Sequence, residues 1–183
     1  MSNNPAEARL FLKQSYSKNL GNVGNFEVDK SLSGKRTQVY HDKNTGNTKV
    51  VHTGTNSLTD WITNSRYLMG NTSGKRFKHA NKIQKQAEIK YGTDKTETLG
   101  HSLGAKIAEQ VGGRSHQVTT LNKPVSAVDF GKKIKKNQTD YKTNLDPVSP
   151  FRFTQRGNKA TYIKSKTYNP LTEHSSDVLG RLK

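Results

Sequence analysis

Residues Thr98 to Gly104 read T-L-G-H-S-L-G, and this stretch decides the fold. It contains the pattern Gly-x-Ser-x-Gly, with Ser102 between Gly100 and Gly104. In this pattern the serine occupies a sharp turn from a strand into a helix, and the glycines let the two backbones approach closely. The next residue, Leu103, then offers its backbone N–H to an oxyanion at the start of the helix. We therefore predict a nucleophile elbow with Ser102 at its tip.

The flanking residues agree with this prediction. Thr96 to Leu99 is prone to form a strand, and Leu103 to Val111 has the spacing of a helix that Gly112 and Gly113 end. A glycine-flanked turn serine without chemistry is the alternative interpretation of the pattern alone. A strand before the serine and a helix after it favour the elbow.

Strands and helices alternate along the rest of the chain. A hairpin is predicted from two strands, at Thr37 to His41 and Thr48 to Thr53, joined by an Asn- and Gly-rich turn. Further helices are predicted at Leu58 to Leu68 and Phe77 to Tyr91, and further strands at Gln117 to Leu121, Tyr141 to Leu145 and Thr161 to Lys164. This alternation predicts an α/β fold with a mainly parallel sheet flanked by helices.

The first 34 residues are polar and weakly periodic. We interpret residues 1–34 as an N-terminal arm with a short helix at Pro5 to Gln14, and residues 35–183 as one domain. Two interpretations of this segment remain open, a disordered tail and an arm that docks on a partner.

The chain is strongly basic and poor in apolar residues. It has 183 residues, 31 of them Lys or Arg against 14 Asp or Glu, and 30% are hydrophobic. Such a charge attracts polyanions, namely nucleic acid, an anionic membrane or an acidic protein, although a solvated basic surface is the simpler alternative. The low apolar content predicts a thin core.

Other classes of protein fit the sequence poorly. There is no cysteine, so disulfide and thiolate chemistry are excluded. The first residues lack the apolar run of a signal peptide, and no stretch approaches the ~18 apolar residues of a membrane span. We therefore expect a protein that is not transmembrane and that is intracellular or packaged in a virus particle.

Five blocks of the chain resemble the class 3 lipases, the fungal triacylglycerol lipase family, in the order in which that family has them. They cover residues 36 to 178 and comprise Val50 to Trp61 (V-V-H-T-G-T-N-S-L-T-D-W), Phe77 to Ala80, the G-H-S-L-G elbow, Val118 to Pro124 and Asn144 to Phe151 (N-L-D-P-V-S-P-F). The resemblance implies an α/β-hydrolase fold in a short, basic member, with no hydrophobic lid in the short polar stretch after Trp61.

The resemblance also implies roles for named residues. Ser102 would be the nucleophile and Asp146 would orient the base. The chain order of this fold is serine, acid, histidine, and of six histidines only His174 follows Asp146. Thr55 would provide a second oxyanion N–H beside that of Leu103. Asp60 and Trp61 match positions of the oxyanion loop, where we favour capping and packing roles.

The function implied is hydrolysis of a carboxylic ester, such as a phospholipid or an acylglycerol, with no metal or organic cofactor. Two departures from the family bear on it. The strand before the elbow reads K-T-E-T-L, which is polar for a buried parallel strand, and Thr53 stands where the family usually has Arg. The alternative is a non-enzymatic basic assembly protein on a lipase-like scaffold, for example a minor component of a virus particle.

Overall fold

A seven-stranded sheet forms the centre of the protein. The computed structural model describes residues 4–55, 74–124, 129, 131–146 and 160–182. The strands lie in chain order and are β1 (Glu27–Val28), β2 (Thr37–His41), β3 (Thr48–His52), β4 (Thr96–His101), β5 (Gln117–Leu121), β6 (Gln138–Thr143) and β7 (Thr161–Ile163). The pairs β1–β2 and β2–β3 are antiparallel, and all pairs from β3 to β7 are parallel. The expected mainly parallel sheet is thereby confirmed.

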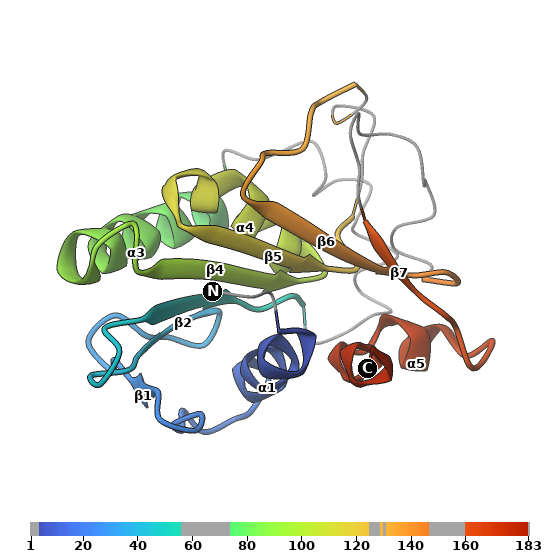
Figure 1. Ribbon diagram of the computed structural model, residues 1–183, viewed down its shortest axis with the longest axis horizontal. Helices are drawn as coiled ribbons and strands as arrows, with labels where there is room; N and C mark the ends of the chain where they lie inside the picture. The colour runs from blue at the N-terminus through green and yellow to red at the C-terminus, as the bar shows by residue number, and fades with distance from the viewer. Residues whose placement is uncertain (1–3, 56–73, 125–128, 130, 147–159, 183) are drawn as a thin grey trace.

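Helices cover both faces of the sheet (Figure 1). On one face lie α3 (Lys75–Tyr91) and α4 (Leu103–Val111), and α4 continues into the short helix η1 (Gly112–Arg114). On the other face lie α1 (Pro5–Ser15), α5 (Pro170–His174) and η3 (Ser176–Arg181). The protein therefore has the layered α/β arrangement that the alternating sequence predicts.

The alternation of side chains along the strands divides the core between these two faces. Val39 and Val50 pack with the α3 side chains Ile83 and Ala87. Their neighbours in sequence, Tyr40 and Val51, belong with Phe11 and Leu12 of α1 to the larger cluster on the other face. Strands β2 and β3 therefore each contribute to a cluster on either face of the sheet.

Helix α1 is part of this core. Asn4 caps it by accepting hydrogen bonds from the first helical N–H groups, and Pro5 occupies its first turn. The Phe11 ring packs edge-on against Phe26 and Tyr40, with ring centroids 5.1 and 5.2 Å apart. The residues before 35, which we expected to form an arm, thus contribute α1 to the core and β1 to the sheet.

The polar sequence of β4 is explained by its partners. The Thr98 and Ser115 hydroxyls are hydrogen-bonded at 2.7 Å, and the Thr96 hydroxyl donates to the carbonyl of Gly92 at 2.6 Å. Glu97 forms an ion pair with Lys49 of the adjacent strand. Thr96 and Thr98 are buried and Glu97 is partly buried, and each of these polar side chains has a partner. The strand can therefore lie inside the sheet although its sequence is polar.

Most of the observed helices and strands cover the residues that the sequence predicts. The bounds of the hairpin and of the helix after the elbow agree closely with the prediction. Strand β6 differs, because it covers Gln138–Thr143 where we predicted Tyr141 to Leu145. Its first residues are polar, but Asp140 is buried and bound by Thr120 and Lys123. The predicted helix at Leu58 to Leu68 lies outside the described residues.

Candidate active site

Ser102 occupies the turn between β4 and α4. Its φ of 57° and ψ of −130° lie in a region that residues other than glycine rarely adopt. The Ser102 N–H donates to the carbonyl of Leu121 at 3.0 Å, and its own carbonyl accepts from Ala105 in the first turn of α4. A strained backbone held by its neighbours is typical of a functional turn, and it is the conformation that an elbow requires.

The two glycines of the motif are required by close backbone contacts. A Cβ atom on Gly100 would lie 2.2 Å from the carbonyl oxygen of Gly104. A Cβ atom on Gly104 would lie 2.0 Å from the carbonyl oxygen of His52 in β3. The strand, the helix and the neighbouring strand therefore meet at distances that only glycine permits.

Asp146 and His174 form a buried pair. Asp146 follows β6, and His174 is the last residue of α5. The Nδ1 atom of His174 lies 2.6 Å from the Asp146 carboxylate, and the two side chains are 8% and 0% exposed. A carboxylate at Nδ1 holds the imidazole in the tautomer whose Nε2 atom can accept a proton.

Glu173 anchors the segment that carries His174. Its buried carboxylate binds Arg181 and accepts from the backbone N–H groups of Lys166 and Thr167. Burial opposes ionisation, but these donors lower the pKa of Glu173 to about 2. The Asn122 side chain also donates to the Glu173 carbonyl at 3.1 Å, so α5 is fixed to the end of β5.

His101 connects the elbow to His174. Its Nε2–H donates to the backbone carbonyl of His174 at 2.6 Å, and the two ring centroids are 4.8 Å apart. Its Nδ1 atom accepts from the Tyr16 hydroxyl at 2.7 Å. Burial, and secondarily the charge of His174, lower the pKa of His101 to about 3. His101 is therefore neutral at physiological pH and acts as a fixed link between two parts of the site.

The loop after β3 lies against the elbow. A Cβ atom on Gly54 would lie 2.9 Å from Cβ of Ser102 and 2.5 Å from the Tyr16 hydroxyl. Thr55 follows directly, and Leu103 is the first residue of α4, where a backbone N–H has no partner within the helix. The two predicted oxyanion residues are therefore on segments that adjoin Ser102.

The structure thus brings the predicted site residues to one region, at the carboxyl ends of the strands. Their catalytic roles stay a prediction. Asp60 and Trp61 lie outside the described residues.

Three residues that support the site were not predicted from the sequence, namely Tyr16, Arg76 and Glu173. Arg76 binds the carbonyls of the loop after β3, and no local pattern in the sequence indicates this contact.

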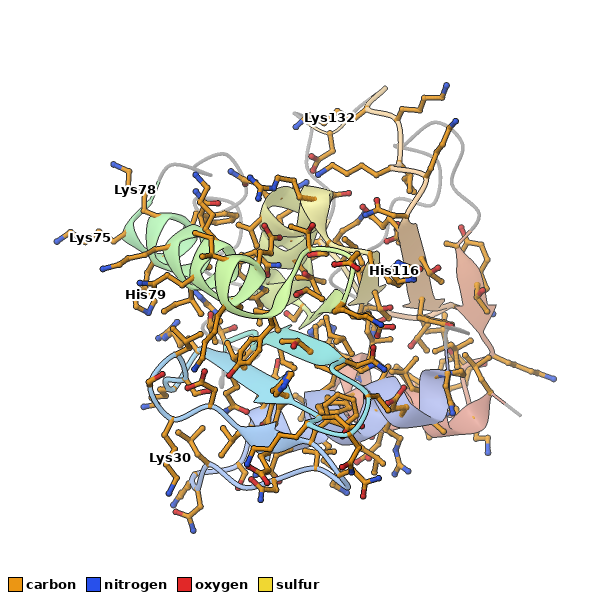
Figure 2. All side chains as sticks on the ribbon, turned by 60° about the vertical axis from the view of Figure 1, so that its left-hand side comes forward. Lys30, Lys75, Lys78, His79, His116 and Lys132 are labelled. Carbon is orange, nitrogen blue, oxygen red and sulfur yellow. The ribbon has the colours of Figure 1, made fainter. Side chains whose placement is uncertain are left out.

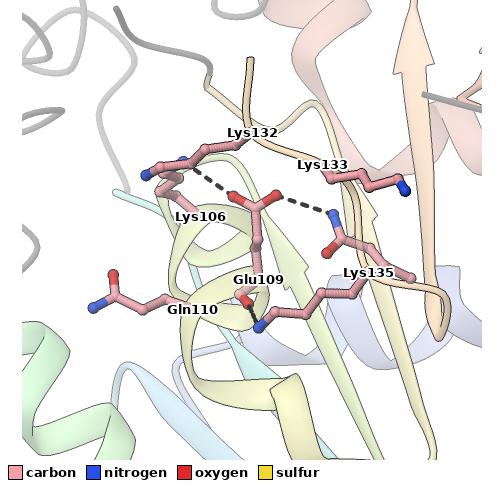
Figure 3. Close-up of a pocket in the computed structure, with 7 residues that line it drawn as sticks. Lys106, Glu109, Gln110, Lys132, Lys133 and Lys135 are labelled. Atoms are coloured by element: carbon pink, nitrogen blue, oxygen red, sulfur yellow. Dashed lines mark hydrogen bonds and ion pairs between the residues drawn. The ribbon is translucent and has the colours of Figure 1, made fainter. Parts of the chain in front are cut away.

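A separate open pocket of about 320 Å³ lies over α4 and the start of β6 (Figure 3). Its lining includes Lys106, Glu109, Lys132 and Lys135, and none of the predicted catalytic residues. Glu109 accepts from Lys106 at 3.0 Å, and its backbone carbonyl accepts from Lys135 at 2.9 Å. Four of the seven lining residues are lysines and one is acidic, so the pocket stays basic. It is distinct from the candidate active site because no predicted catalytic residue lines it.

Comparison with known protein families agrees with this architecture. Residues 7–146 match the phospholipase-like family described as the Tle-like phospholipase domain. The chain belongs to this phospholipase-like family. The match includes Ser102 and ends at Asp146, so the predicted role of His174 rests on the chain order and on its contact with Asp146. No curated protein sequence matches the chain.

Solved structures similar to this phospholipase-like chain include fungal lipases. Lip2 lipase from Yarrowia lipolytica is 16% identical with a TM-score of 0.57, over 92% of this chain and 80% of that one. A triacylglycerol lipase from Penicillium expansum is 14% identical with a TM-score of 0.56, over 89% and 79%. A protein from Thermoplasma acidophilum that is described as a predicted CIB-like hydrolase is 13% identical with a TM-score of 0.52, over 88% and 96%. At these identities the similarity shows a shared lipase-like α/β-hydrolase fold.

Proposed function

We propose that the protein is a serine hydrolase that cleaves a carboxylic ester of a phospholipid. The observation that carries the proposal is the buried hydrogen bond between His174 and Asp146, beside an elbow in which Ser102 is strained. The family's description as a phospholipase domain supports the choice of phospholipid.

In the proposed reaction His174 removes the Ser102 proton as the Ser102 oxygen attacks the ester carbonyl. Asp146 stabilises the imidazolium that forms. The N–H groups of Leu103 and Thr55 stabilise the oxyanion. His174 then protonates the leaving alcohol, and water hydrolyses the acyl-enzyme by the same steps in reverse.

Labelling with a fluorophosphonate probe tests this function, together with hydrolysis of a short-chain aryl ester and of phospholipid vesicles. We expect the wild-type protein to be labelled and to release fatty acid, and Ser102→Ala to do neither. His174→Ala should lower labelling by several orders of magnitude with unchanged circular dichroism. Folded wild-type protein that neither labels nor hydrolyses any of these esters would refute the proposal and favour the assembly-protein alternative.

We also propose that helix α3 docks on an anionic phospholipid surface. Lys78, Lys82 and Lys85 are exposed, and their spacing places them on one side of the helix. Figure 2 shows Lys75 and Lys78 pointing away from the body of the protein. Farther along the helix Ile89 is 81% exposed. Among the described residues no helix is long and apolar enough to span a bilayer, so the proposed contact is peripheral.

Sedimentation with vesicles tests this docking. We expect binding to vesicles that contain phosphatidylglycerol, weak binding to phosphatidylcholine alone, and loss of binding as salt is raised. Replacing the three lysines by Gln should weaken binding by about 1 kcal/mol for each lysine near the surface. Equal binding of the variant and the wild type would show that these lysines of α3 do not form the vesicle-binding surface. Binding to duplex DNA with no binding to anionic vesicles would favour the assembly-protein alternative.

A further inference from the structure

Two consecutive carbonyl groups of the loop after β3 converge on one arginine. The same guanidinium nitrogen of Arg76, in the first turn of α3, donates to the carbonyl of Thr53 and, at 3.1 Å, to that of Gly54. Successive carbonyls of an extended chain point to opposite sides. Their convergence therefore requires the chain to bend at Gly54, and Arg76 stabilises that bend.

The opposite side of the same peptide unit is held by Tyr16. Its hydroxyl accepts from the Gly54 N–H at 2.9 Å and donates to His101. Because the C=O and N–H of a trans peptide point in opposite directions, the Thr53–Gly54 unit is held at both ends. In the next unit Arg76 holds the Gly54 carbonyl, so the Thr55 N–H lies on the side away from the guanidinium.

We propose that Arg76 and Tyr16 are positioning residues that hold the Thr55 N–H as an oxyanion donor beside Ser102. The inference rests on the proposed hydrolase function. A donor contributes to catalysis when its direction is set before the oxyanion forms, because no reorganisation is then needed during the reaction. Here a cation and a buried hydroxyl set that direction from two sides.

The ionisation of both side chains suits this role. Burial raises the pKa of Tyr16 to about 12, so the phenol keeps the proton that it donates to His101. Burial and the nearby Arg36 lower the pKa of Arg76 to about 10, which still leaves the guanidinium charged at neutral pH. Among the described residues Arg76 binds carbonyl oxygens and no carboxylate, so its charge acts directly on this loop.

Steady-state kinetics on a soluble short-chain aryl ester test the inference. We expect Arg76→Ala to lower kcat by about 10²-fold and Tyr16→Phe by about 10-fold, the range typical of a disturbed oxyanion donor, with KM within about threefold of wild type. Added guanidinium should restore part of the kcat of Arg76→Ala, while sodium chloride of equal ionic strength should not. The matched control is Arg114→Gln, which removes an exposed arginine at the far end of α4 and should keep wild-type kcat.

The outcomes separate the two proposals. Folded wild-type protein without esterase activity or labelling overturns the hydrolase function, and with it the positioning role. An active wild type with kcat within twofold in both Arg76→Ala and Tyr16→Phe overturns the positioning role alone. If the loss of kcat accompanies a lower melting temperature and added guanidinium does not restore kcat, Arg76 contributes to stability. This outcome also overturns the positioning role. If Arg76→Ala does not fold, Arg76→Lys and Tyr16→Phe decide by the same criteria.

Discussion

At the scale of single residues, the candidate site depends on groups that have little freedom. Ser102 has a positive φ, Gly104 lies against the backbone of β3, and His101 is hydrogen-bonded through both ring nitrogens. Strain of this kind persists when the surroundings determine the conformation. The elbow is therefore held mainly by backbone contacts that larger residues would break.

Gly104→Ala tests the close contact at the elbow. The added methyl group would lie 2.0 Å from a backbone oxygen of His52, so β3 or α4 must move. We expect a loss of about 1–3 kcal/mol, seen as a lower midpoint in urea, and a slower fluorophosphonate reaction. The control is Gly34→Ala, because a Cβ atom there meets nothing within 4 Å and the φ is not positive. Equal stability of the two variants would contradict the steric argument.

At the scale of elements, charged side chains replace apolar ones between α4 and the sheet. Lys123 follows β5 and is completely buried, with its ammonium 2.6 Å from Glu109 of α4 and 3.0 Å from Asp140 of β6. Burial alone would lower the pKa of Lys123, but the two carboxylates raise it above its usual value. This ionic cluster joins the elbow helix to two strands in a chain that is poor in apolar residues.

Lys123→Met tests this cluster, because methionine keeps most of the volume and removes the charge. The buried Asp140 carboxylate then loses its ion pair with Lys123, and Glu109 keeps its ion pair with Lys106. We expect a loss of about 3–5 kcal/mol in chemical denaturation. The matched control is Lys132→Met, which breaks a partly exposed ion pair with Asp129 and should cost at most about 1 kcal/mol. A Lys123→Met protein as stable as the control would show that the buried charges contribute little.

At the scale of the whole molecule, the first and the last described helices pack together. Helix α1 packs against η3, where Val178 and Leu179 join Phe11 and Leu12 in one cluster. Arg9 of α1 also binds Asp177 at 2.8 Å. The segment that carries His174 is therefore held between α1, the sheet and the Glu173–Arg181 pair, so unfolding of this segment and loss of the candidate site are coupled.

Acid unfolding tests the contribution of Glu173. Its pKa is about 2 in the folded protein against an ordinary value of 4.5. Because the pKa of Glu173 is lower in the folded protein, the ionised carboxylate stabilises the fold above pH 4.5. This stabilisation, up to about 3 kcal/mol, is lost as the pH falls toward 2. We expect Glu173→Gln to be less stable at pH 7 and to lose less stability between pH 5 and 3, in urea titrations at each pH.

The control for this experiment is Glu27→Gln, which removes an exposed carboxylate paired with Lys43. Its stability should follow the wild-type dependence on pH. If the free energy of unfolding of Glu173→Gln and that of the wild type depend on pH in the same way, the buried carboxylate does not cause the loss of stability in acid.

The sequence by itself determined the features that depend on local chemistry. The glycine spacing around Ser102 predicted the elbow, because the turn needs glycine at two defined positions. The periodicity of the strands and helices predicted the parallel sheet, and the order of residues in the chain singled out His174. These features depend on neighbouring residues or on the order of residues along the chain, so the sequence alone can indicate them.

Only the tertiary structure decided how the site is supported. Tyr16 meets His101 across 85 positions of the chain, and no periodicity links two residues that far apart. Likewise, the polar residues of β4 looked unsuitable for a buried strand until Ser115 and Lys49 were seen beside them. Burial of a polar group depends on the partner that satisfies it, and that partner is supplied by the fold.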